Sequence, residues 1–165
     1  KSEDTNISMT YLGLKGKVAD NTTLGGFWLN GNKLNDDEVY GFNVDANFGK
    51  VWVGGEWLDV KDGNDASAWV AGIGYGAFDQ SKQGTWDVKA QYFDQDKKAP
   101  IVSSTWNQFY DATNTWEKGY KGWMATVDYA LAKNVGLSAY YGFSGETQDG
   151  NDLGDYYRAE LNYKF

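Results

Sequence analysis

Carboxylates are the side chains of this sequence whose type and spacing invite a catalytic interpretation. Asp36, Asp37 and Glu38 follow one another, and paired carboxylates carry out the acid and base steps of glycoside hydrolysis. Three consecutive residues are more simply explained as a solvated turn. The chain has no Cys and no His, which excludes disulfides, thiolate and imidazole metal sites, and every Ser-His or Cys-His catalytic pair. We therefore predict that the protein is not an enzyme.

Two identical tetrads are the next candidates for chemistry. Asp62 to Asp65 and Asp149 to Asp152 both read Asp-Gly-Asn-Asp, and their carboxylate and carbonyl oxygens suit calcium. Neither tetrad has the spacing of the twelve-residue calcium loop, which closes with a Glu. Asp-Gly and Asn-Asp are common turn sequences, so we interpret both tetrads as turns. The sequence thus predicts no metal and no cofactor.

The composition favours β-structure and argues against a nucleic-acid partner. Among 165 residues, 15 Lys and Arg oppose 23 Asp and Glu, which gives a net charge of −8 without any dense basic cluster. The chain holds 8 Trp, 12 Tyr and 8 Phe, and aromatic residues are enriched in strands. The longest stretch without a charged residue, Ala66 to Phe78, covers 13 residues, whereas a membrane-spanning helix needs roughly 20. We expect one all-β domain over residues 1–165.

Strict alternation of apolar and polar residues predicts the strands. It is clearest at the end of the chain, where the apolar and aromatic series is Tyr157, Ala159, Leu161, Tyr163 and Phe165. The same period recurs upstream and predicts about nine antiparallel strands, joined alternately by short turns and long polar loops. The short turns are 20–23, 49–50 and 132–134, with a nine-residue connection at 76–84. The long loops are 32–38, 59–67, 94–120 and 144–155. The first two strands, about 7–18 and 24–33, fit either facing.

Two environments are compatible with the apolar side of these strands. In a soluble β-domain this side packs inward, whereas in a transmembrane barrel it faces lipid between two girdles of aromatic residues. Large aromatic residues recur near both ends of the predicted strands: Trp69 and Tyr75 bracket smaller residues, and so do Trp123 and Tyr129. Hydrocarbon tolerates only helices and closed barrels. Because no spanning helix is predicted, we favour an antiparallel transmembrane β-barrel.

The last third of the chain resembles a known family. Residues Tyr157 to Phe165 look like the closing strand of bacterial outer-membrane β-barrels, which ends in Phe after aromatic or apolar residues at every second position. The stretch from Val127 to Leu137 is similar to the penultimate hairpin of general porins and of porins with an S-layer-homology tether. The resemblance implies the bacterial outer membrane, contact with its lipid, and an assembly signal, formed by Tyr163 and Phe165, that the barrel-assembly machinery reads.

The resemblance also orients the chain. Such barrels have their C-terminus in the periplasm, which places the long loops outside the cell. Nine strands would leave Lys1 outside as well, whereas bacterial single-chain barrels have an even number of strands and both ends in the periplasm. We therefore expect the chain to be the C-terminal part of a porin of about 16 strands, whose N-terminal strands are missing. Porin resemblance further implies a homotrimer.

The predicted function depends on the polar side of the strands. Eight strands leave an interior filled by side chains, whereas about 16 to 18 leave an aqueous channel, in which charges of both signs select small hydrated solutes. We predict passive diffusion of small hydrophilic solutes or ions. The predicted pore-lining residues are Asn43, Asp45, Asn47, Glu56, Asp87, Lys89, Gln91, Thr126, Asp128, Arg158, Glu160, Asn162 and Lys164. The alternatives are a complete eight-stranded barrel without a channel, serving as an adhesin or structural anchor, and a soluble carbohydrate-binding β-domain.

The loop at 94–120 carries more apolar surface than a freely solvated loop should show. Its aromatic residues are Trp106, Phe109, Tyr110 and Trp116. One interpretation is that they bend into the barrel as a constriction, as one loop does in general porins. The others are an extension of the strands beyond the membrane, stacking of the rings on sugars, and packing beneath the loop itself.

Overall fold

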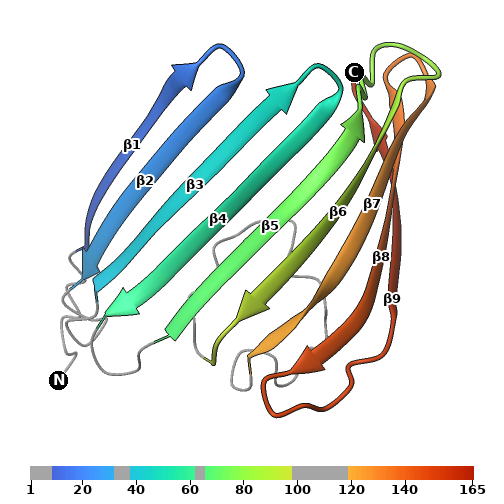
Figure 1. Cartoon of the computed structure of the whole chain (residues 1–165). Helices are drawn as coiled ribbons and strands as arrows, with labels where there is room; N and C mark the ends of the chain where they lie inside the picture. The colour runs from blue at the N-terminus through green and yellow to red at the C-terminus, as the bar shows by residue number, and fades with distance from the viewer. Residues whose placement is uncertain (1–8, 32–37, 62–65, 98–118) are drawn as a thin grey trace, which may run out of the picture.

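The computed structural model of the chain describes residues 9–31, 38–61, 66–97 and 119–165. Within these ranges the chain forms nine antiparallel strands and no helix, and the strands follow one another across a single sheet (Figure 1). They are β1 (Met9–Ala19), β2 (Thr22–Gly31), β3 (Glu38–Phe48), β4 (Val51–Lys61), β5 (Ala66–Gly76), β6 (Trp86–Gln95), β7 (Tyr120–Ala132), β8 (Val135–Thr147) and β9 (Tyr156–Tyr163). The all-β class and the expected strand number are confirmed.

Tight turns connect the strands at one end of the sheet (Figure 1). Two-residue turns join β1 to β2, β3 to β4 and β7 to β8, and residues 77–85 join β5 to β6. Gly49 (φ +65°) and Asn134 (φ +63°) adopt the left-handed conformation that such tight hairpins favour. No helix in the described part of the chain is long and apolar enough to cross a membrane.

At the opposite end the strands run further than the alternation predicted. β8 continues to Thr147, although the sequence indicated a loop from Ser144 onward. Lys121 lies opposite Glu146, and their charged ends form an ion pair of 2.8 Å. The β7–β8 ladder thus continues through polar residues, beyond the alternating apolar residues that predicted its length.

The cross-strand register assigns each residue to a face, because directly opposed residues point to the same side of a sheet. One row across the sheet reads Leu24, Val44, Gly55, Ala71, Tyr92, Trp123 and Phe143. The next row reads Thr23, Asp45, Gly54, Gly72, Gln91 and Met124. The first row belongs to an apolar face and the second to a polar face. Leu12 and Trp28 lie on the apolar face and Phe27 on the polar face, which decides the facing of β1 and β2.

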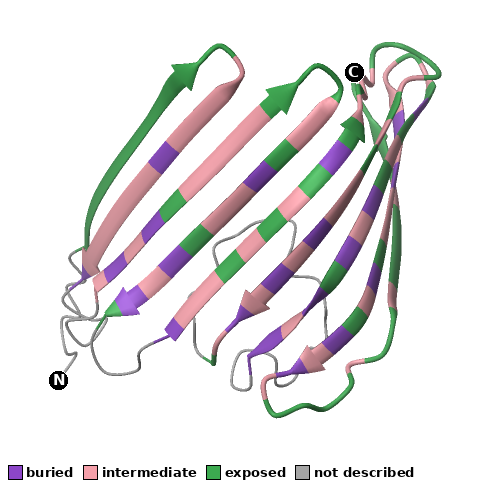
Figure 2. Ribbon diagram, viewed as in Figure 1, coloured by how far each residue is buried: buried purple, intermediate pink, exposed green. Residues whose placement is uncertain are grey.

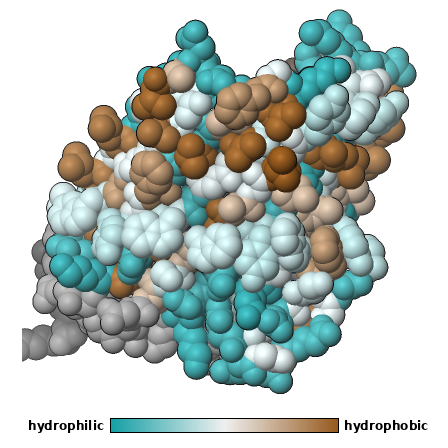
Figure 3. Space-filling view, viewed as in Figure 1, coloured by the Kyte–Doolittle hydropathy of each residue, from teal (hydrophilic) through white to brown (hydrophobic). Residues whose placement is uncertain are grey.

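The apolar face is exposed across the whole sheet. Ile73 on β5 is 58% exposed and Leu161 on β9 is 67% exposed, although both are aliphatic residues in the middle of strands. A hydrophobic band crosses the strands in Figure 3, with hydrophilic surface above and below it. The sheet curves so that β6 to β9 turn away from the viewer, and the apolar face is the convex one (Figures 1 and 3).

Two belts of aromatic rings border this band. Five strands carry two aromatic residues six positions apart: Phe42 and Phe48, Trp69 and Tyr75, Trp86 and Tyr92, Trp123 and Tyr129, and Tyr157 and Tyr163. Six residues span about 20 Å along a strand. On β6 the belt residues are Tyr92 and Trp86. Each is displaced by one row relative to β5, because the residues opposite Trp69 and Tyr75 are Asp94 and Val88. Each belt is therefore oblique to the strands, as in a sheet whose strands are tilted relative to a common plane.

β1 and β9 form the two edges of the sheet. Both strands run from the long-loop end to the short-turn end, so they point in the same direction. Every residue of β1 is exposed (Figure 2). In the described residues the two edges are not paired with each other, and closure of the sheet into a barrel is not shown.

Gly76 ends β5 in a conformation that a larger residue cannot share. Its φ is +130°, and a Cβ there would lie 2.4 Å from the Trp86 carbonyl oxygen and 2.5 Å from Asp87 Cα. Gly84 also has a positive φ, +85°, but a Cβ there meets nothing within 4 Å. We expect Gly84→Ala to lower the free energy of unfolding by about 1–2 kcal/mol through backbone strain. Gly76→Ala should cost about 1–3 kcal/mol more. Urea unfolding followed by Trp fluorescence measures both, and equal losses would contradict the packing assigned to Gly76.

Hydrogen bonds organise the β5–β6 connection around Asp79. Its carboxylate accepts bonds from the Ser81 hydroxyl at 2.6 Å and the Ser81 N–H at 3.0 Å, and lies 3.3 Å from Lys82 Nζ. These contacts, the Ser81 hydroxyl first, lower the pKa of Asp79 below its ordinary value of 3.8. A lowered pKa stabilises the fold above the unfolded value, and this contribution is lost as the pH falls through the folded value.

Ser81→Ala should therefore raise the pKa of Asp79 toward 3.8, so that the connection loses its stabilisation at a higher pH. The ¹³C carboxyl resonance of Asp79, followed over an acid titration, reports this change. Ser67→Ala is the matched control, because the Ser67 hydroxyl donates to Asp96 instead. A Ser81→Ala titration curve that coincides with the control would show that the hydroxyl is not the cause.

Candidate functional site

The polar face brings together the side chains that the sequence assigned to a lumen. The register places twelve of the thirteen on this concave side: Asn43, Asp45, Asn47, Glu56, Asp87, Lys89, Gln91, Thr126, Asp128, Arg158, Glu160 and Asn162. Lys164 lies beyond the end of β9, where its N–H donates to the Asn134 carbonyl at 3.0 Å. The alternation thus identified one common surface, although it could not tell what fills the space in front of it.

Charges on this face form local networks near the short-turn end. Asp87 and Asp128 are directly opposed on β6 and β7. Lys89 lies 3.8 Å from Asp87, and the Ser138 hydroxyl donates to Asp128. These contacts offset the repulsion between the two carboxylates.

The strands β8 and β9 carry a further charged group. Arg158 and Glu160 form an ion pair, and the Arg158 guanidinium lies 5.9 Å from the centre of the Tyr140 ring. A guanidinium over an aromatic face is a cation–π contact.

The other part of the polar face, toward the long loops, is apolar. Phe93, Tyr120 and Met124 form a buried cluster, with Val70, Tyr140, Leu153 and Tyr156 packed against it. The sequence interpretation missed these residues, because it treated this side of every strand as polar. A signal was present in adjacent apolar pairs such as Tyr92-Phe93 and Trp123-Met124, in which one residue must point to each face.

A small hollow interrupts the polar face beside Gly54 on β4, which lies opposite Gly72 on β5. A Cβ at Gly54 would lie 2.2 Å from Trp52 Cζ2, and a Cβ at Gly72 would lie 2.1 Å from Gln91 Cγ. The Trp52 ring and the Gln91 stem therefore lie flat over the backbone. We call this space, about 180 Å³ in volume, the glycine hollow; its side-chain lining is Asn43, Asp45, Trp52, Glu56, Val70 and Gln91.

Two contacts hold Trp52, a residue that the sequence interpretation did not select. Its indole N–H donates to Asp45 Oδ1 at 3.2 Å, and Lys89 Nζ lies 6.0 Å from the ring centre. Trp52 sits on the polar face because it is opposite Asn47. Trp52 lies between Val51 and Val53, so it belongs to a continuous apolar run. Alternation cannot tell which residue of such a run points to the polar face.

Gln91 is buried in the wall of the glycine hollow without a hydrogen-bond partner. Only 1% of its surface is exposed, and neither its side-chain oxygen nor its side-chain nitrogen is bonded within the described residues. A buried polar group left unpaired costs about 1–3 kcal/mol. The hollow therefore contains a group that requires a ligand or water to satisfy it.

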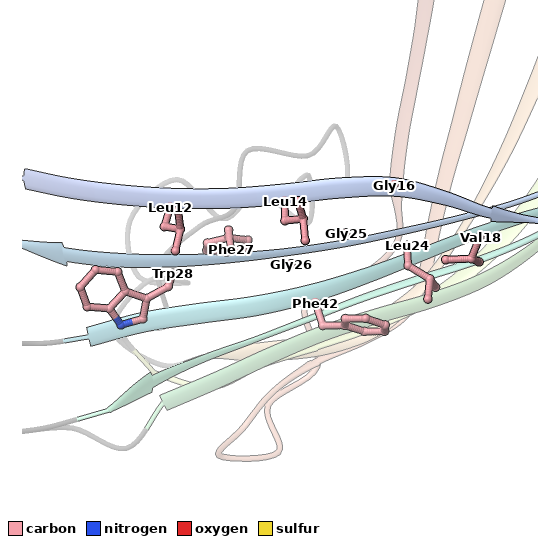
Figure 4. A pocket seen from close by; sticks show the side chains of 10 residues that line it. All are labelled: Leu12, Leu14, Gly16, Val18, Leu24, Gly25, Gly26, Phe27, Trp28 and Phe42. Carbon is pink, nitrogen blue, oxygen red and sulfur yellow. The ribbon is translucent and has the colours of Figure 1, made fainter.

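A second, larger hollow of about 500 Å³ lies toward the β1 edge (Figure 4). Leu12, Leu14, Val18, Leu24 and Phe42 surround it. Gly16 and Gly26 leave it open, since a Cβ at Gly16 would meet nothing within 4 Å. Its lining is apolar, in contrast to that of the glycine hollow.

The tetrad from Asp149 to Asp152 forms the predicted turn. Gly150 has φ +81° and its N–H donates to the Thr147 carbonyl at 2.8 Å, while Asp152 Oδ1 accepts the Gly154 N–H at 2.6 Å. Within the described ranges no group of three or more acidic residues is arranged to hold a metal ion.

Several sequence predictions fall outside the described residues or at the end of the chain. Trp106, Phe109, Tyr110 and Trp116 lie outside the described residues, as do Asp36, Asp37 and the tetrad 62–65. Of the predicted assembly signal, Tyr163 ends β9 and Phe165 is fully exposed; their ring centres are 4.8 Å apart. Comparison with protein-family models and with curated proteins gives no match.

The unpaired amide of Gln91 predicts an unusual response to substitution. We expect Gln91→Met to raise the free energy of unfolding by about 1–3 kcal/mol, because it removes a buried unsatisfied group at nearly constant volume. Gln80→Met is the matched control, for which we expect the free energy of unfolding to fall. Gln80 Nε2 donates to the carbonyls of Asn134 at 3.1 Å and Asn162 at 2.8 Å, so its loss should destabilise the fold. Urea unfolding measures both variants, and a destabilising Gln91→Met would contradict this account.

Proposed function

We propose that the chain is the C-terminal part of a bacterial outer-membrane porin, which allows small hydrophilic solutes or ions to diffuse passively through a water-filled barrel. One observation carries this proposal. The sheet has an exposed apolar convex face, bordered by two aromatic belts, and a polar concave face. Transmembrane barrels combine an outward apolar band, aromatic girdles and a polar interior in this way.

The exposure of the apolar face supports lipid over a second protein layer. In a β-sandwich two sheets interdigitate about 10 Å apart, whereas the described residues form one sheet. The oblique belts give a further argument, because the interfaces of a membrane are planes and the strands of a barrel cross them with a tilt. Packing against a second protein layer would not require the aromatic residues to lie in two such belts.

The directions of the edge strands support a barrel larger than nine strands. β1 and β9 are parallel, so an all-antiparallel barrel needs an odd number of additional strands between them. Seven more strands give 16, a size that leaves an aqueous channel. We propose that the missing N-terminal strands of the same protein occupy this place, that the barrel-assembly machinery reads Tyr163 and Phe165, and that the barrels associate as homotrimers.

The buried cluster on the polar face supports a second candidate function. Phe93, Tyr120 and Met124 are apolar residues on the concave side, as in a barrel whose interior is filled by side chains. Such a barrel would serve as an adhesin or anchor and would conduct nothing. Planar-bilayer recordings separate the two functions, since stepwise conductance is expected from a porin and none from a filled barrel.

Single cysteines test which face meets lipid, because the chain itself contains no Cys. In liposomes, a water-soluble maleimide should label Asn162→Cys on the polar face at least about tenfold faster than its neighbour Leu161→Cys on the apolar face. Thiolates react only where water reaches them. Thr126→Cys and Val127→Cys repeat the comparison on β7. Equal labelling of neighbours, or a chain that stays monodisperse in buffer without detergent, would overturn the membrane proposal.

A further inference from the structure

We propose that the glycine hollow is a binding site for small organic cations, namely solutes that carry an ammonium or guanidinium group. The inference deepens the porin proposal and rests on it for the passage of the solute, but the binding itself does not require conduction. Four kinds of evidence support it: negative charge, an unpaired buried amide, an aromatic face and the size of the space.

The hollow carries negative charge on two carboxylates. Asp45 and Glu56 both line it, and within the described residues neither forms an ion pair. Two basic residues of the same face are paired with other carboxylates: Lys17, in the row of Asp45, lies 3.8 Å from Asp20, and Lys89 lies 3.8 Å from Asp87. A cleft lined by one sign of charge concentrates the opposite ion, so this part of the polar face attracts cations.

The Gln91 amide gives an independent indication of a ligand. Its stem is fixed over Gly72, its side chain is 99% buried, and both of its polar atoms are without a partner. The amide belongs to the same lining as the two carboxylates. An N–H donor in the hollow would be accepted by the Gln91 oxygen, which removes the cost of leaving that atom unpaired.

Trp52 supplies a surface that favours cations over neutral solutes. Asp45 fixes the ring through its indole N–H, and the ring lies over Gly54 with its Cε3 atom toward Gly74. The same ring already has Lys89 Nζ 6.0 Å from its centre, within the range of cation–π attraction. A solute cation in the hollow would interact with Trp52 in the same way.

The dimensions and the donor requirement define the class of ligand. A hollow of about 180 Å³ admits a group of a few heavy atoms. The oxygens of Asp45, Glu56 and Gln91 are acceptors, which match the several N–H groups of ammonium or guanidinium. A neutral sugar can use the same acceptors, but it gains nothing from the two negative charges. The charge therefore selects the cation.

NMR titration of the full chain in detergent micelles tests the proposal with methylguanidinium as the probe. The indole N–H resonance of Trp52, assigned with Trp52→Phe, reports occupancy of the hollow. We expect methylguanidinium to shift this resonance at concentrations at least about tenfold lower than methylurea, its uncharged analogue. Glu56→Gln should weaken the binding at least about tenfold, since the acceptor loses its negative charge and the hydrogen bond to it is weakened. Glu160→Gln, on the same face but paired with Arg158, should leave it unchanged.

Gln91→Met separates loss of binding from loss of structure, because we expect it to fold more stably and yet bind methylguanidinium more weakly. Equal affinities for methylguanidinium and methylurea, or equal effects of Glu56→Gln and Glu160→Gln, would overturn the proposal. Glucose that binds at least as well as methylguanidinium would assign the hollow to neutral sugars and overturn it as well. A failed porin proposal gives a different result, namely no conductance in bilayers while methylguanidinium still shifts the Trp52 resonance.

Discussion

The apolar face of the sheet requires an apolar medium, and the other features of the fold depend on this requirement. Burial of one large apolar side chain is worth about 1.5–3 kcal/mol, so that covering about five of them matches the whole stability of an ordinary domain, about 5–15 kcal/mol. The sheet exposes many more than five such side chains, from Leu14 on β1 to Leu161 on β9. The lipid contact that we propose would permit so regular an alternation, because lipid, unlike a second sheet, requires no complementary shape. Small residues then suffice between the aromatic belts.

The polar face follows the opposite rule, since its side chains must be satisfied by one another, by water or by a ligand. Glycines make this possible. Gly54 and Gly72 allow Trp52 and Gln91 to lie flat on the sheet, which places a ring, an amide and two carboxylates around one small space. Larger residues at these positions would raise the side chains and remove the hollow. Gly25 and Gly41 have the same relation to Asn43 and Phe27 on the neighbouring strands.

The sequence was sufficient for the strands and their faces wherever small and aromatic residues alternate strictly with polar ones, as on β7 and β9. It failed where the pattern breaks for a physical reason. Phe93 and Met124 are apolar residues on the polar face, which alternation cannot assign. The extension of β8 includes polar residues such as Glu146, which pairs with Lys121, and polar residues look like loop in a hydrophobicity pattern. The glycine hollow depends on the register of β3 to β6, because its six lining side chains come from four strands. No local sequence window contains that register.

The medium that stabilises the apolar face destabilises the edges of the same sheet. In hydrocarbon each unpaired backbone N–H or C=O costs several kcal/mol, and β1 and β9 each present a row of them on their outer side. In water such edges cost little, because the solvent satisfies them. A membrane environment therefore implies additional strands at both edges, whereas an aqueous environment would leave the convex face uncovered. The larger closed barrel that we propose would meet both conditions, because it would cover the apolar face with lipid and pair the two edges with further strands.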